Sequence, residues 1–318
     1  MSLLVVSRDE VAAHLPYEAC IPLMREAMTA LSRGRTRQTL RAIIDLEGGG
    51  AFGVMPGAAD GTAFGAKLIS VFPAAATGAP SHQGLVALFD PVSGAPVAAI
   101  DASELTAIRT AAASAAATDA LARPDARRLA VLGTGEQALR HVEALRCVRD
   151  IEEVRIWGRL SDRAAALAER LGGRATSGVE EAVAGADIVC TVTASPEPVL
   201  LGRWIGEGTH LNLVGSSRAG PAEVDTALVA RARFFADHAE GVRRQGAEFL
   251  NALEEGAIGG GHLLGEIGEV FAGTLAGRTA PEEITAYKSL GSIVQDLAAG
   301  WYLYEKAKAE GFGTRVPF

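Results

Sequence analysis

The chain of 318 residues is long enough for about two domains, and its 48% hydrophobic and 21% charged residues exclude a disordered protein. Its 30 basic and 38 acidic residues give a net charge of −8 without a basic cluster, so nucleic acid is not an expected partner. The three cysteines, Cys20, Cys147 and Cys190, lie far apart without a CxxC pair, which argues against a disulfide framework or a structural zinc site and predicts reduced thiols.

The first part of the chain is expected to form helices and a sheet. An apolar run at Leu3–Val6 precedes a capping box, in which Ser7 and Glu10 mark the start of a helix. A second helical pattern covers Ile21–Leu31, and an alanine-rich helix is expected at Glu104–Ala122. Between them lie β-branched and aromatic runs at Arg41–Leu46, Ala51–Met55, Gly65–Phe72, Gly84–Asp90 and Pro96–Asp101. Their short, helix-free intervals predict an antiparallel or mixed sheet.

Beyond Pro124 strands and helices alternate, which predicts an α/β fold with a parallel sheet and helices on both of its faces. The expected strands are Leu129–Leu132, Val154–Trp157, Ile188–Val192, His210–Val214 and Arg233–Ala236. The expected helices are Glu136–Val148, Ser161–Leu171, Val179–Ala184 and Glu223–Arg231. A glycine-rich, poorly periodic region, Gly256–Gly277, precedes a last helical pattern at Ser289–Glu310.

The sequence favours a soluble, cytoplasmic protein without a membrane partner. Its N-terminal segment has neither a basic region nor a small-residue cleavage site, so no signal peptide is expected. Residues 68–89 carry no charge, but Pro73, Gly78 and Pro80 divide them into strand, loop and strand.

The first strand–helix junction of the alternating region is the strongest candidate for a ligand site. The strand leads into Gly133-Thr134-Gly135, and Ala138 takes the third position of the pattern GxGxxG/A. Gly133 permits a tight turn, and Gly135 lets the backbone approach a pyrophosphate at the helix N-terminus. An ordinary glycine-rich turn is the alternative, but the strand–turn–helix context favours dinucleotide binding.

The end of the next strand predicts which dinucleotide is bound. An NAD site usually has Asp or Glu there, whereas this chain has Gly158, Arg159, Leu160 and Ser161. Arg159 could bind a 2′-phosphate, with Ser161 as a further donor, so NADP is favoured over NAD. The alternative is a solvated arginine at the end of a strand.

Lysine usage points to Lys67. The chain has only four lysines among its 30 basic residues, and Lys67 lies in the apolar run FGAKLISVF. An ammonium group can release a proton when it is desolvated, whereas a guanidinium cannot. Proton transfer or substrate polarisation is therefore the favoured role, and a lysine extending from an edge strand to solvent is the alternative.

Two arginines and a histidine complete the set of candidates. Arg109 lies among small residues in LTAIRTAAASAAA, and Arg41 precedes an apolar strand. If the two arginines meet, they could hold a carboxylate; separately, each would more often form a salt bridge. Ser81 and His82 fall in the loop PSHQG, where a lone histidine is more often structural than catalytic.

Many of these segments resemble the ornithine cyclodeaminase/μ-crystallin family over nearly the whole chain. The shared segments are MPG, GAKLISVFP, HQG with LFDPVSGAP, LTAIRTAAASA, VLGTGEQA, VRIWGR, EAVAGADIVCTVT, HLNLVGSSR and KSLG with the following QD. The resemblance implies a Rossmann domain at residues 119–288. It also implies an α+β domain for substrate binding and dimerisation, built from residues 1–118 and 289–318, and hence a homodimer.

The resemblance also implies roles for individual residues. Arg41, Lys67 and Arg109 would surround the substrate carboxylate and the reacting carbon. The residues expected along the nicotinamide cofactor are His82, Arg109, Thr110, Gly133, Thr134, Gly135, Glu136, Gln137, Gly158, Arg159, Ser161, Thr193, Ala194, Val214, Ser217 and Ser289.

One residue that differs from the ornithine cyclodeaminase pattern favours one of the family's activities over the others. Ornithine cyclodeaminases have an Asp where this chain has Ser217, in VGSSR, and a hydroxyl cannot act as a carboxylate base. The segment looks more like the ketimine reductase and μ-crystallin branch. The expected function is therefore NAD(P)H-dependent reduction of a cyclic imino acid, such as Δ1-pyrroline-2-carboxylate or Δ1-piperideine-2-carboxylate. The alternatives are an ornithine or lysine cyclodeaminase with recycled NAD, an alanine-type dehydrogenase, and a non-catalytic binder of small ligands.

Overall fold

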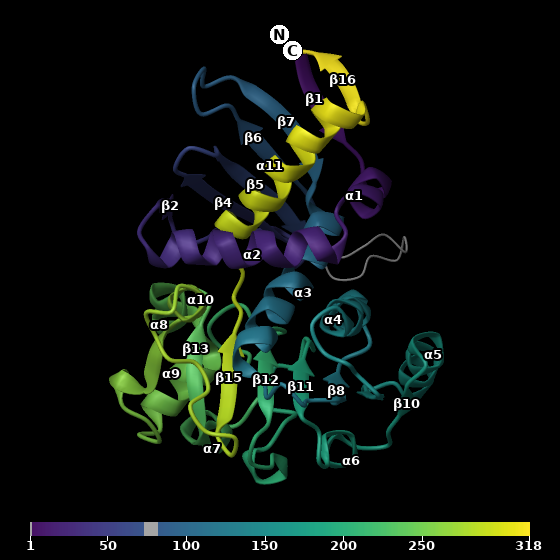
Figure 1. The fold of residues 1–318 in the computed structure, drawn as a ribbon, viewed down its shortest axis with the longest axis vertical. Helices are drawn as coiled ribbons and strands as arrows, with labels where there is room; N and C mark the ends of the chain where they lie inside the picture. The colour runs from purple at the N-terminus through teal and green to yellow at the C-terminus, as the bar shows by residue number, and fades with distance from the viewer. Residues whose placement is uncertain (1, 73–81) are drawn as a thin grey trace. The chain divides into compact units, whose positions relative to one another are not determined.

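The computed structural model describes residues 2–72 and 82–318, without the side chain of His82. The chain divides into two compact units (Figure 1): unit 1 comprises Met1–Arg109 and Ser292–Phe318, and unit 2 comprises Thr110–Gly291. The first division falls within α3 (Ala102–Leu121). Among the described residues, no helix is long and apolar enough to cross a membrane.

Unit 1 contains a mixed sheet, as the sequence predicts. Its strand order is β16-β1-β7-β6-β5-β4-β2, with β3 also paired to β4. The strands are β1 (Ser2–Val6), β2 (Thr36–Gln38), β3 (Ala42–Asp45), β4 (Ala51–Ala59), β5 (Ala63–Val71), β6 (His82–Phe89), β7 (Pro96–Asp101) and β16 (Thr314–Pro317). β1 and β7 pair in parallel, and the other described pairs are antiparallel. The short strands β2 and β16 were not expected from the sequence.

Helices cover one face of this sheet. They are α1 (Arg8–His14), α2 (Tyr17–Ser32) and α11 (Ile293–Glu310). The expected capping box begins α1, where the Ser7 backbone N–H donates to Glu10 Oε2 at 2.8 Å. α11 lies against β4, β5 and β6 (Figure 1). Val86 and Leu88 of β6 are fully buried. The terminal helix begins at Ile293 rather than Ser289, because the Ser292 side chain caps it by accepting from the Val294 N–H.

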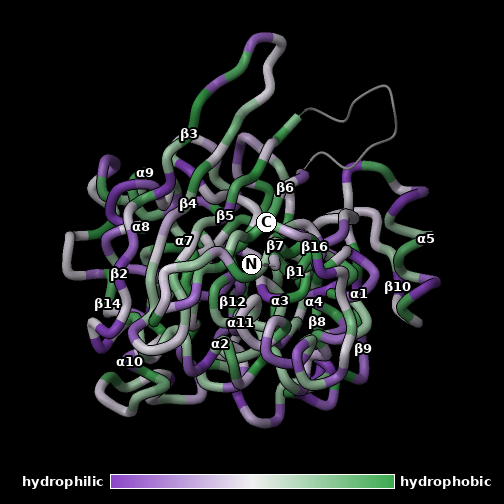
Figure 2. Tube along the Cα trace, turned by 90° about the horizontal axis from the view of Figure 1, so that it is seen from above, coloured by the Kyte–Doolittle hydropathy of each residue, from purple (hydrophilic) through white to green (hydrophobic). Residues whose placement is uncertain are grey.

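The opposite face of the same sheet is apolar and partly open. Side chains alternate along a strand, so Leu85 points away from the helix-covered side that holds Val86. Leu85 is 38% exposed, whereas Val86 is 0% exposed. All residues of β3 are exposed, and the hairpin of β3 and β4 extends outward in Figure 2.

Unit 2 contains the predicted parallel sheet. Its strand order is β10-β9-β8-β11-β12-β15-β13-β14, and every described pair is parallel. The strands are β8 (Arg128–Leu132), β9 (Glu153–Trp157), β10 (Arg174–Ala175), β11 (Ile188–Thr191), β12 (His210–Leu213), β13 (Ala232–Ala236), β14 (Leu263–Glu266) and β15 (Ile284–Lys288). The order reverses between β8 and β11, which is the Rossmann arrangement.

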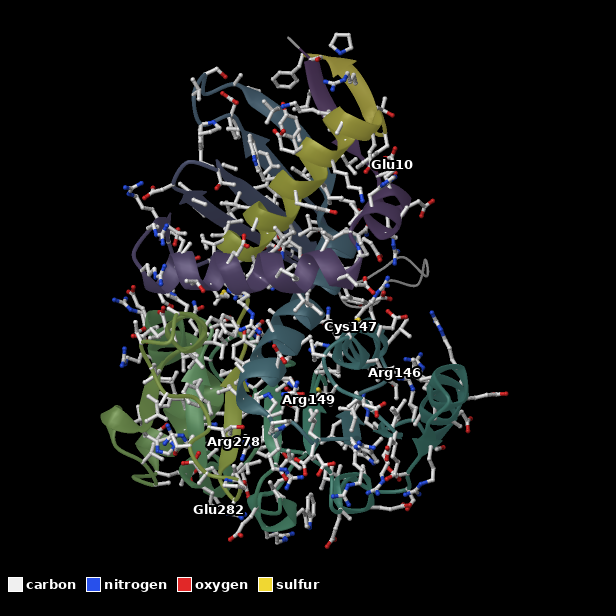
Figure 3. All side chains as sticks on the ribbon, in the orientation of Figure 1. Glu10, Arg146, Cys147, Arg149, Arg278 and Glu282 are labelled. Carbon is white, nitrogen blue, oxygen red and sulfur yellow. The ribbon has the colours of Figure 1, made fainter. Side chains whose placement is uncertain are left out.

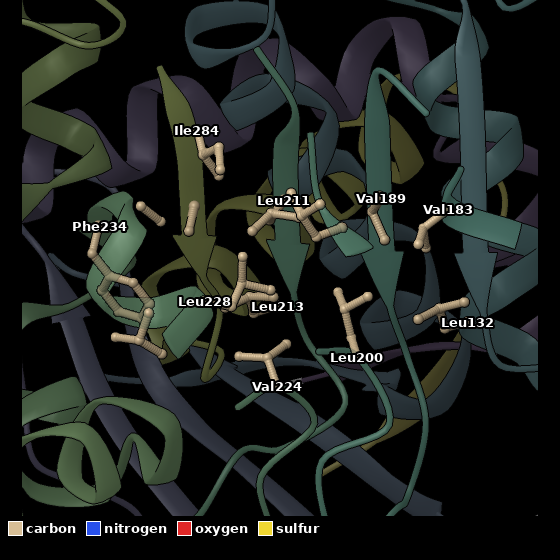
Figure 4. Packing of buried hydrophobic residues seen from close by; sticks show 14 of the residues in the cluster. Leu132, Val183, Val189, Leu200, Leu211, Leu213, Val224, Leu228, Phe234 and Ile284 are labelled. Carbon is tan, nitrogen blue, oxygen red and sulfur yellow. The ribbon is translucent and has the colours of Figure 1, made fainter. Parts of the chain in front are cut away.

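Helices lie on both faces of this sheet, as predicted. They are α4 (Glu136–Arg146), α5 (Ser161–Leu171), α6 (Val179–Val183), α7 (Thr226–Arg231), α8 (Ala239–Gln245), α9 (Ala247–Glu254) and α10 (Ile267–Phe271), with 3-10 turns at Gly202–Trp204 and Gly260–His262. In the buried cluster, Leu228 of α7 lies beside Leu213, and Val183 of α6 lies beside Val189 (Figure 4). Asn212 points to the other face, where its Nδ2 donates to Thr118 Oγ1 of α3 at 2.9 Å.

Arginine side chains fix the end of α3 within unit 2. Arg149, labelled in Figure 3, donates to the carbonyls of Thr118 and Asp119 in the last turn of α3 and to that of Ala122, which follows the helix. The last carbonyls of a helix lack partners further along it, and the guanidinium donates to all three, of which Thr118 also accepts from the Ala122 N–H at 2.9 Å.

Several elements of unit 2 differ from the sequence analysis. α7 begins at Thr226 rather than Glu223, because the Asp225 side chain caps it by accepting from the Leu228 N–H at 3.0 Å. α8, α9 and β15 lie where the sequence analysis assigned no element. The Gly-rich region contains the short elements β14 and α10.

Candidate active site

The carboxyl ends of the unit 2 strands form one edge. Leu132 lies opposite both Trp157 and Thr191, and Leu213 lies opposite both Thr191 and Lys288. The residues that follow these strand ends therefore share that edge. Among them are the expected cofactor residues Gly133, Gly158, Thr193, Ala194, Val214 and Ser289.

The turn from β8 into α4 has the geometry that a pyrophosphate needs. Gly133 has φ +134°, and a Cβ there would lie 2.7 Å from the Val192 carbonyl oxygen. Gly135 begins α4 without a side-chain cap, and a Cβ on it would meet nothing within 4 Å. The backbone N–H groups of the first turn, from Glu136 and Gln137 onward, are therefore accessible to an anion.

Two buried polar atoms at the same edge support this fit. Gln137 Oε1 and Ser289 Oγ are buried and have no hydrogen-bond partner among the described residues. Buried polar atoms are normally paired, so a polar ligand at this edge would account for both. The Glu136 carboxylate points along the helix instead, accepting from Arg140 Nε at 2.9 Å.

The end of β9 presents a cation. Arg159 and Ser161 are exposed, and Arg159 makes no hydrogen bond or ion pair with another described residue. Gly158 packs so closely that a Cβ there would lie 2.4 Å from Thr134 Cγ2. Asp162 also lies in the first turn of α5, so one acidic group is near the same strand end.

A buried carboxylate that the sequence analysis placed in a helix joins two of the loops at this edge. Glu223 Oε1 accepts from the Thr193 N–H at 2.6 Å and from Thr193 Oγ1 at 2.7 Å. Its Oε2 accepts from Thr191 Oγ1 at 2.8 Å and from the Gly215 N–H at 2.7 Å. Burial raises the pKa of Glu223, and the nearby Lys288 ammonium opposes that effect.

Lys288 extends this buried network. Its Nζ lies 2.7 Å from Glu248 Oε2 and donates to the Ser216 carbonyl oxygen at 2.7 Å. Glu248 in turn accepts from the Glu223 N–H at 3.2 Å. Hydrogen bonds from Lys288 and to Glu223 therefore fix the position of the loop after β12. This loop includes Val214 and the half-buried Ser217.

Unit 1 brings the three predicted substrate-binding cations together. Lys67 lies on β5, between β4 and β6, and is 3% exposed, so the alternative of an exposed lysine on an edge strand is wrong. Arg109 on α3 is 4% exposed. Both Arg109 and Arg41 act electrostatically on Lys67, which places all three in one cluster.

Asp296, which the sequence analysis did not single out, is the acidic partner of this cluster. Its Oδ1 accepts from Arg109 Nε at 2.9 Å and lies 3.5 Å from Lys67 Nζ. The neighbouring Gln295 accepts from Arg109 Nη1 at 2.7 Å. Arg109 therefore forms a salt bridge, yet its Nη2 makes no hydrogen bond to a described residue.

The surroundings of Lys67 suit a proton donor. Burial lowers the pKa of Lys67 to about 8, with repulsion from Arg109 and Arg41 adding to the effect and Asp296 opposing it. A pKa close to the working pH lets a group donate and recover a proton readily.

The remaining predicted residues are Thr110, Ser81 and His82. Thr110 is buried on α3. His82 begins β6, but its side chain lies outside the described residues, as does Ser81.

Comparison with known proteins gives consistent matches along the chain. A profile of the ornithine cyclodeaminase/mu-crystallin family matches residues 1–311. Ketimine reductase mu-crystallin of Mus musculus is 36% identical over 309 residues, which cover 94% of this chain and 96% of the mouse protein. The structure of Thermococcus litoralis Delta(1)-pyrroline-2-carboxylate reductase in complex with NADH and L-proline is 33% identical, with a TM-score of 0.95 and coverage of 99% of this chain and 100% of that chain. An archaeal alanine dehydrogenase dimer with bound NAD is 31% identical, with a TM-score of 0.94 and full coverage of both chains.

Proposed function

Because the chain belongs to the ornithine cyclodeaminase/mu-crystallin family, we propose that it reduces cyclic imino acids with a reduced nicotinamide dinucleotide. The substrate is a cyclic ketimine carboxylate, such as Δ1-pyrroline-2-carboxylate or Δ1-piperideine-2-carboxylate, and the product is proline or pipecolate. The observation that carries the proposal is the buried Lys67, held beside Arg109 and a single carboxylate.

In this proposal unit 1 supplies the groups that act on the substrate. Arg109 binds the substrate carboxylate through Nη2, the nitrogen not engaged by Asp296 or Gln295, and Arg41 adds a second cation. Lys67 holds a proton at Nζ and transfers it to the imine nitrogen. The reduced nicotinamide, when bound along the strand ends of unit 2, supplies the hydride for the imine carbon.

The test is an assay of cofactor oxidation with both cyclic imines, alongside pyruvate with ammonia as an open-chain substrate. We expect net consumption of reduced cofactor with a cyclic imine. Turnover of pyruvate and ammonia alone would favour an alanine-type dehydrogenase. Ligand binding without any turnover would favour a binding protein and contradict the proposal.

Ornithine and lysine, the substrates of a cyclodeaminase, test the alternative activity. The position of the cyclodeaminase carboxylate is occupied by Ser217, whose hydroxyl cannot serve as a base near neutral pH. We expect little ammonia from ornithine or lysine in the presence of NAD. Efficient ammonia release without net change in the cofactor would identify a cyclodeaminase instead.

We also propose that the protein prefers NADPH to NADH. Arg159 is an exposed arginine at the end of β9 with no ion-pair partner among the described residues, and Ser161 offers a hydroxyl beside it. A charge-assisted contact to the 2′-phosphate would strengthen NADPH binding about ten- to a hundred-fold.

Substitution of Arg159 tests this preference. We expect Arg159→Ala to weaken NADPH binding about ten- to a hundred-fold and to leave NADH binding nearly unchanged, as measured by titration. Arg170→Ala, also exposed on α5, is the control. Introducing an acidic residue at Gly158 is unsuitable, because its Cβ would clash with Thr134. Tighter binding of NADH than NADPH by the wild type would overturn the preference.

We further propose that the open face of the unit 1 sheet pairs with a second copy of the chain. An apolar sheet face that is exposed in one chain is normally buried against another element. The archaeal alanine dehydrogenase with a similar fold was solved as a dimer. Unit 1 would then serve both substrate binding and dimerisation.

A further inference from the structure

Asp296 has an unusual position among the charged groups of unit 1. It is 0% exposed and lies in the first turn of α11. One oxygen, Oδ1, is shared between Arg109 Nε at 2.9 Å and Lys67 Nζ at 3.5 Å. The other oxygen, Oδ2, is buried and has no hydrogen-bond partner among the described residues.

The charge balance around this carboxylate is uneven. Among the described residues, the charged groups with the largest effect on Lys67 are Asp296 on α11, Arg109 on α3, and Arg41 before β3. Burial raises the pKa of the Cys20 thiol on α2 to about 12, so it contributes no negative charge near neutral pH. Asp296 is thus the acidic group that both Lys67 and Arg109 contact, and a buried charge without a partner is strongly unfavourable.

We propose that Asp296 is a positioning residue, which aligns Arg109 for the substrate carboxylate and keeps Lys67 charged until the substrate nitrogen takes its proton. This inference rests on the proposed function. In the reduction, the bond between Lys67 Nζ and its proton breaks and a bond between that proton and the imine nitrogen forms. The reduced cofactor gives two electrons as hydride to the imine carbon, and neutral Lys67 then recovers a proton from solvent.

The geometry separates this role from that of a structural ion pair. The contact between Lys67 and Asp296, at 3.5 Å, is at the limit of a hydrogen bond, whereas Arg109 is held at 2.9 Å. Asp296 therefore fixes the guanidinium firmly and supplies Lys67 mainly with a neighbouring negative charge. Lys67 remains able to turn toward a substrate and give up its proton.

The small number of lysines permits a direct test that needs no substrate. With 13Cε-labelled lysine the protein gives signals from only four side chains, and Lys67→Arg identifies that of Lys67. In the wild type we expect Lys67 to be charged at pH 7 and to titrate with a pKa of about 8. In Asp296→Asn we expect its pKa to fall by about one unit or more, because the opposing charge is removed.

A matched variant checks that the change is specific. Glu305 is an exposed acid on the same helix and pairs with Lys308. Glu305→Gln should lower the pKa of Lys308 and leave the Lys67 signal unchanged. An unchanged Lys67 titration in a folded Asp296→Asn variant would overturn the proposal. A neutral Lys67 in the wild type at pH 7 would also overturn it, even if the variant fails to fold.

Kinetics provide the second readout. The alkaline limb of the kcat/KM profile for imine reduction should move to lower pH in Asp296→Asn, because Lys67 loses its proton earlier. Cofactor affinity should not change. An unshifted limb would overturn the positioning role. If the wild type reduces no imine, the proposed function fails, while the lysine titration still decides whether Asp296 holds the charge of Lys67.

Discussion

Two of the four lysines are buried, and their partners distinguish their roles. Lys288 lies 2.7 Å from a carboxylate oxygen and donates to a backbone carbonyl at 2.7 Å, so its charge is tightly paired. Among the described residues, the acidic neighbour of Lys67 is Asp296 at 3.5 Å, and the guanidinium groups of Arg109 and Arg41 act on it as well. A lysine thus stabilises a loop in unit 2, whereas the lysine of unit 1 is the one that we propose as proton donor.

Substitution of Lys67 should affect turnover rather than cofactor binding. Lys67→Arg retains a positive charge but cannot release a proton, so we expect kcat to fall about 10²–10⁴-fold. Lys67→Met should give a similar loss, while the dissociation constant of NADPH stays near the wild-type value. Steady-state kinetics and cofactor titration measure both quantities. Lys308→Ala, an exposed lysine on α11, is the control, and near wild-type kcat in Lys67→Arg would contradict a proton-transfer role.

The loops that follow β11 and β12 depend on one side chain. Glu223 accepts from Thr191 at the end of β11, from Thr193 in the loop that follows it, and from Gly215 in the loop after β12. A carboxylate offers acceptors at both oxygens, and every one of these contacts uses that property. The two loops therefore keep a fixed spacing at the edge where the cofactor is proposed to lie.

Glu223→Gln should loosen this part of the sheet edge. An amide group would turn an N–H toward either the Gly215 or the Thr193 backbone N–H, leaving a partly buried donor unpaired. We expect the free energy of unfolding to fall by about 1–3 kcal/mol and the dissociation constant of NADPH to rise. Chemical denaturation and cofactor titration measure the two effects, with the exposed Glu254→Gln as control. Unchanged stability and cofactor affinity would show that the carboxylate does not hold the loops.

Local sequence patterns identified most elements but not the contacts between them. Strand–helix alternation and the glycine turn predicted the parallel sheet, because these features depend on neighbouring residues. Asp296 was not found as a site residue, because it is 229 positions from Lys67 and resembles any polar residue in a helix. The sequence feature that could identify Asp296 is the polar pair Gln295 and Asp296 within the apolar run IVQDLAAGW. Glu223 was assigned to a helix, since the cap at Asp225 is recognisable only once its hydrogen bonds are known.

The two units bury their sheets differently. The parallel sheet of unit 2 has helices on both faces, as parallel sheets almost always do. In unit 1 the helices α1, α2 and α11 cover one face only. The apolar residues that share the other face, by strand register, include Leu3, Val5, Phe52, Val54, Pro56, Phe64, Ala66, Leu68, Leu85, Ala87, Phe89, Ala99 and Val316. This apolar surface is what a second copy of the chain would cover.

A charged residue on that face should separate the proposed dimer. Leu85 lies on β6 near the middle of the sheet and is 38% exposed in the single chain, so Leu85→Lys need not disturb the fold of unit 1. Obligate interfaces bury about 2,000 Å² or more, and an uncompensated ammonium in such an interface is strongly unfavourable. Light scattering at micromolar protein should therefore give twice the chain mass for the wild type and the single-chain mass for Leu85→Lys. Val92→Lys, at a position that is 94% exposed in the turn between β6 and β7, should remain dimeric. A monomeric wild type, or a dimeric Leu85→Lys variant, would mean that this face does not join two chains.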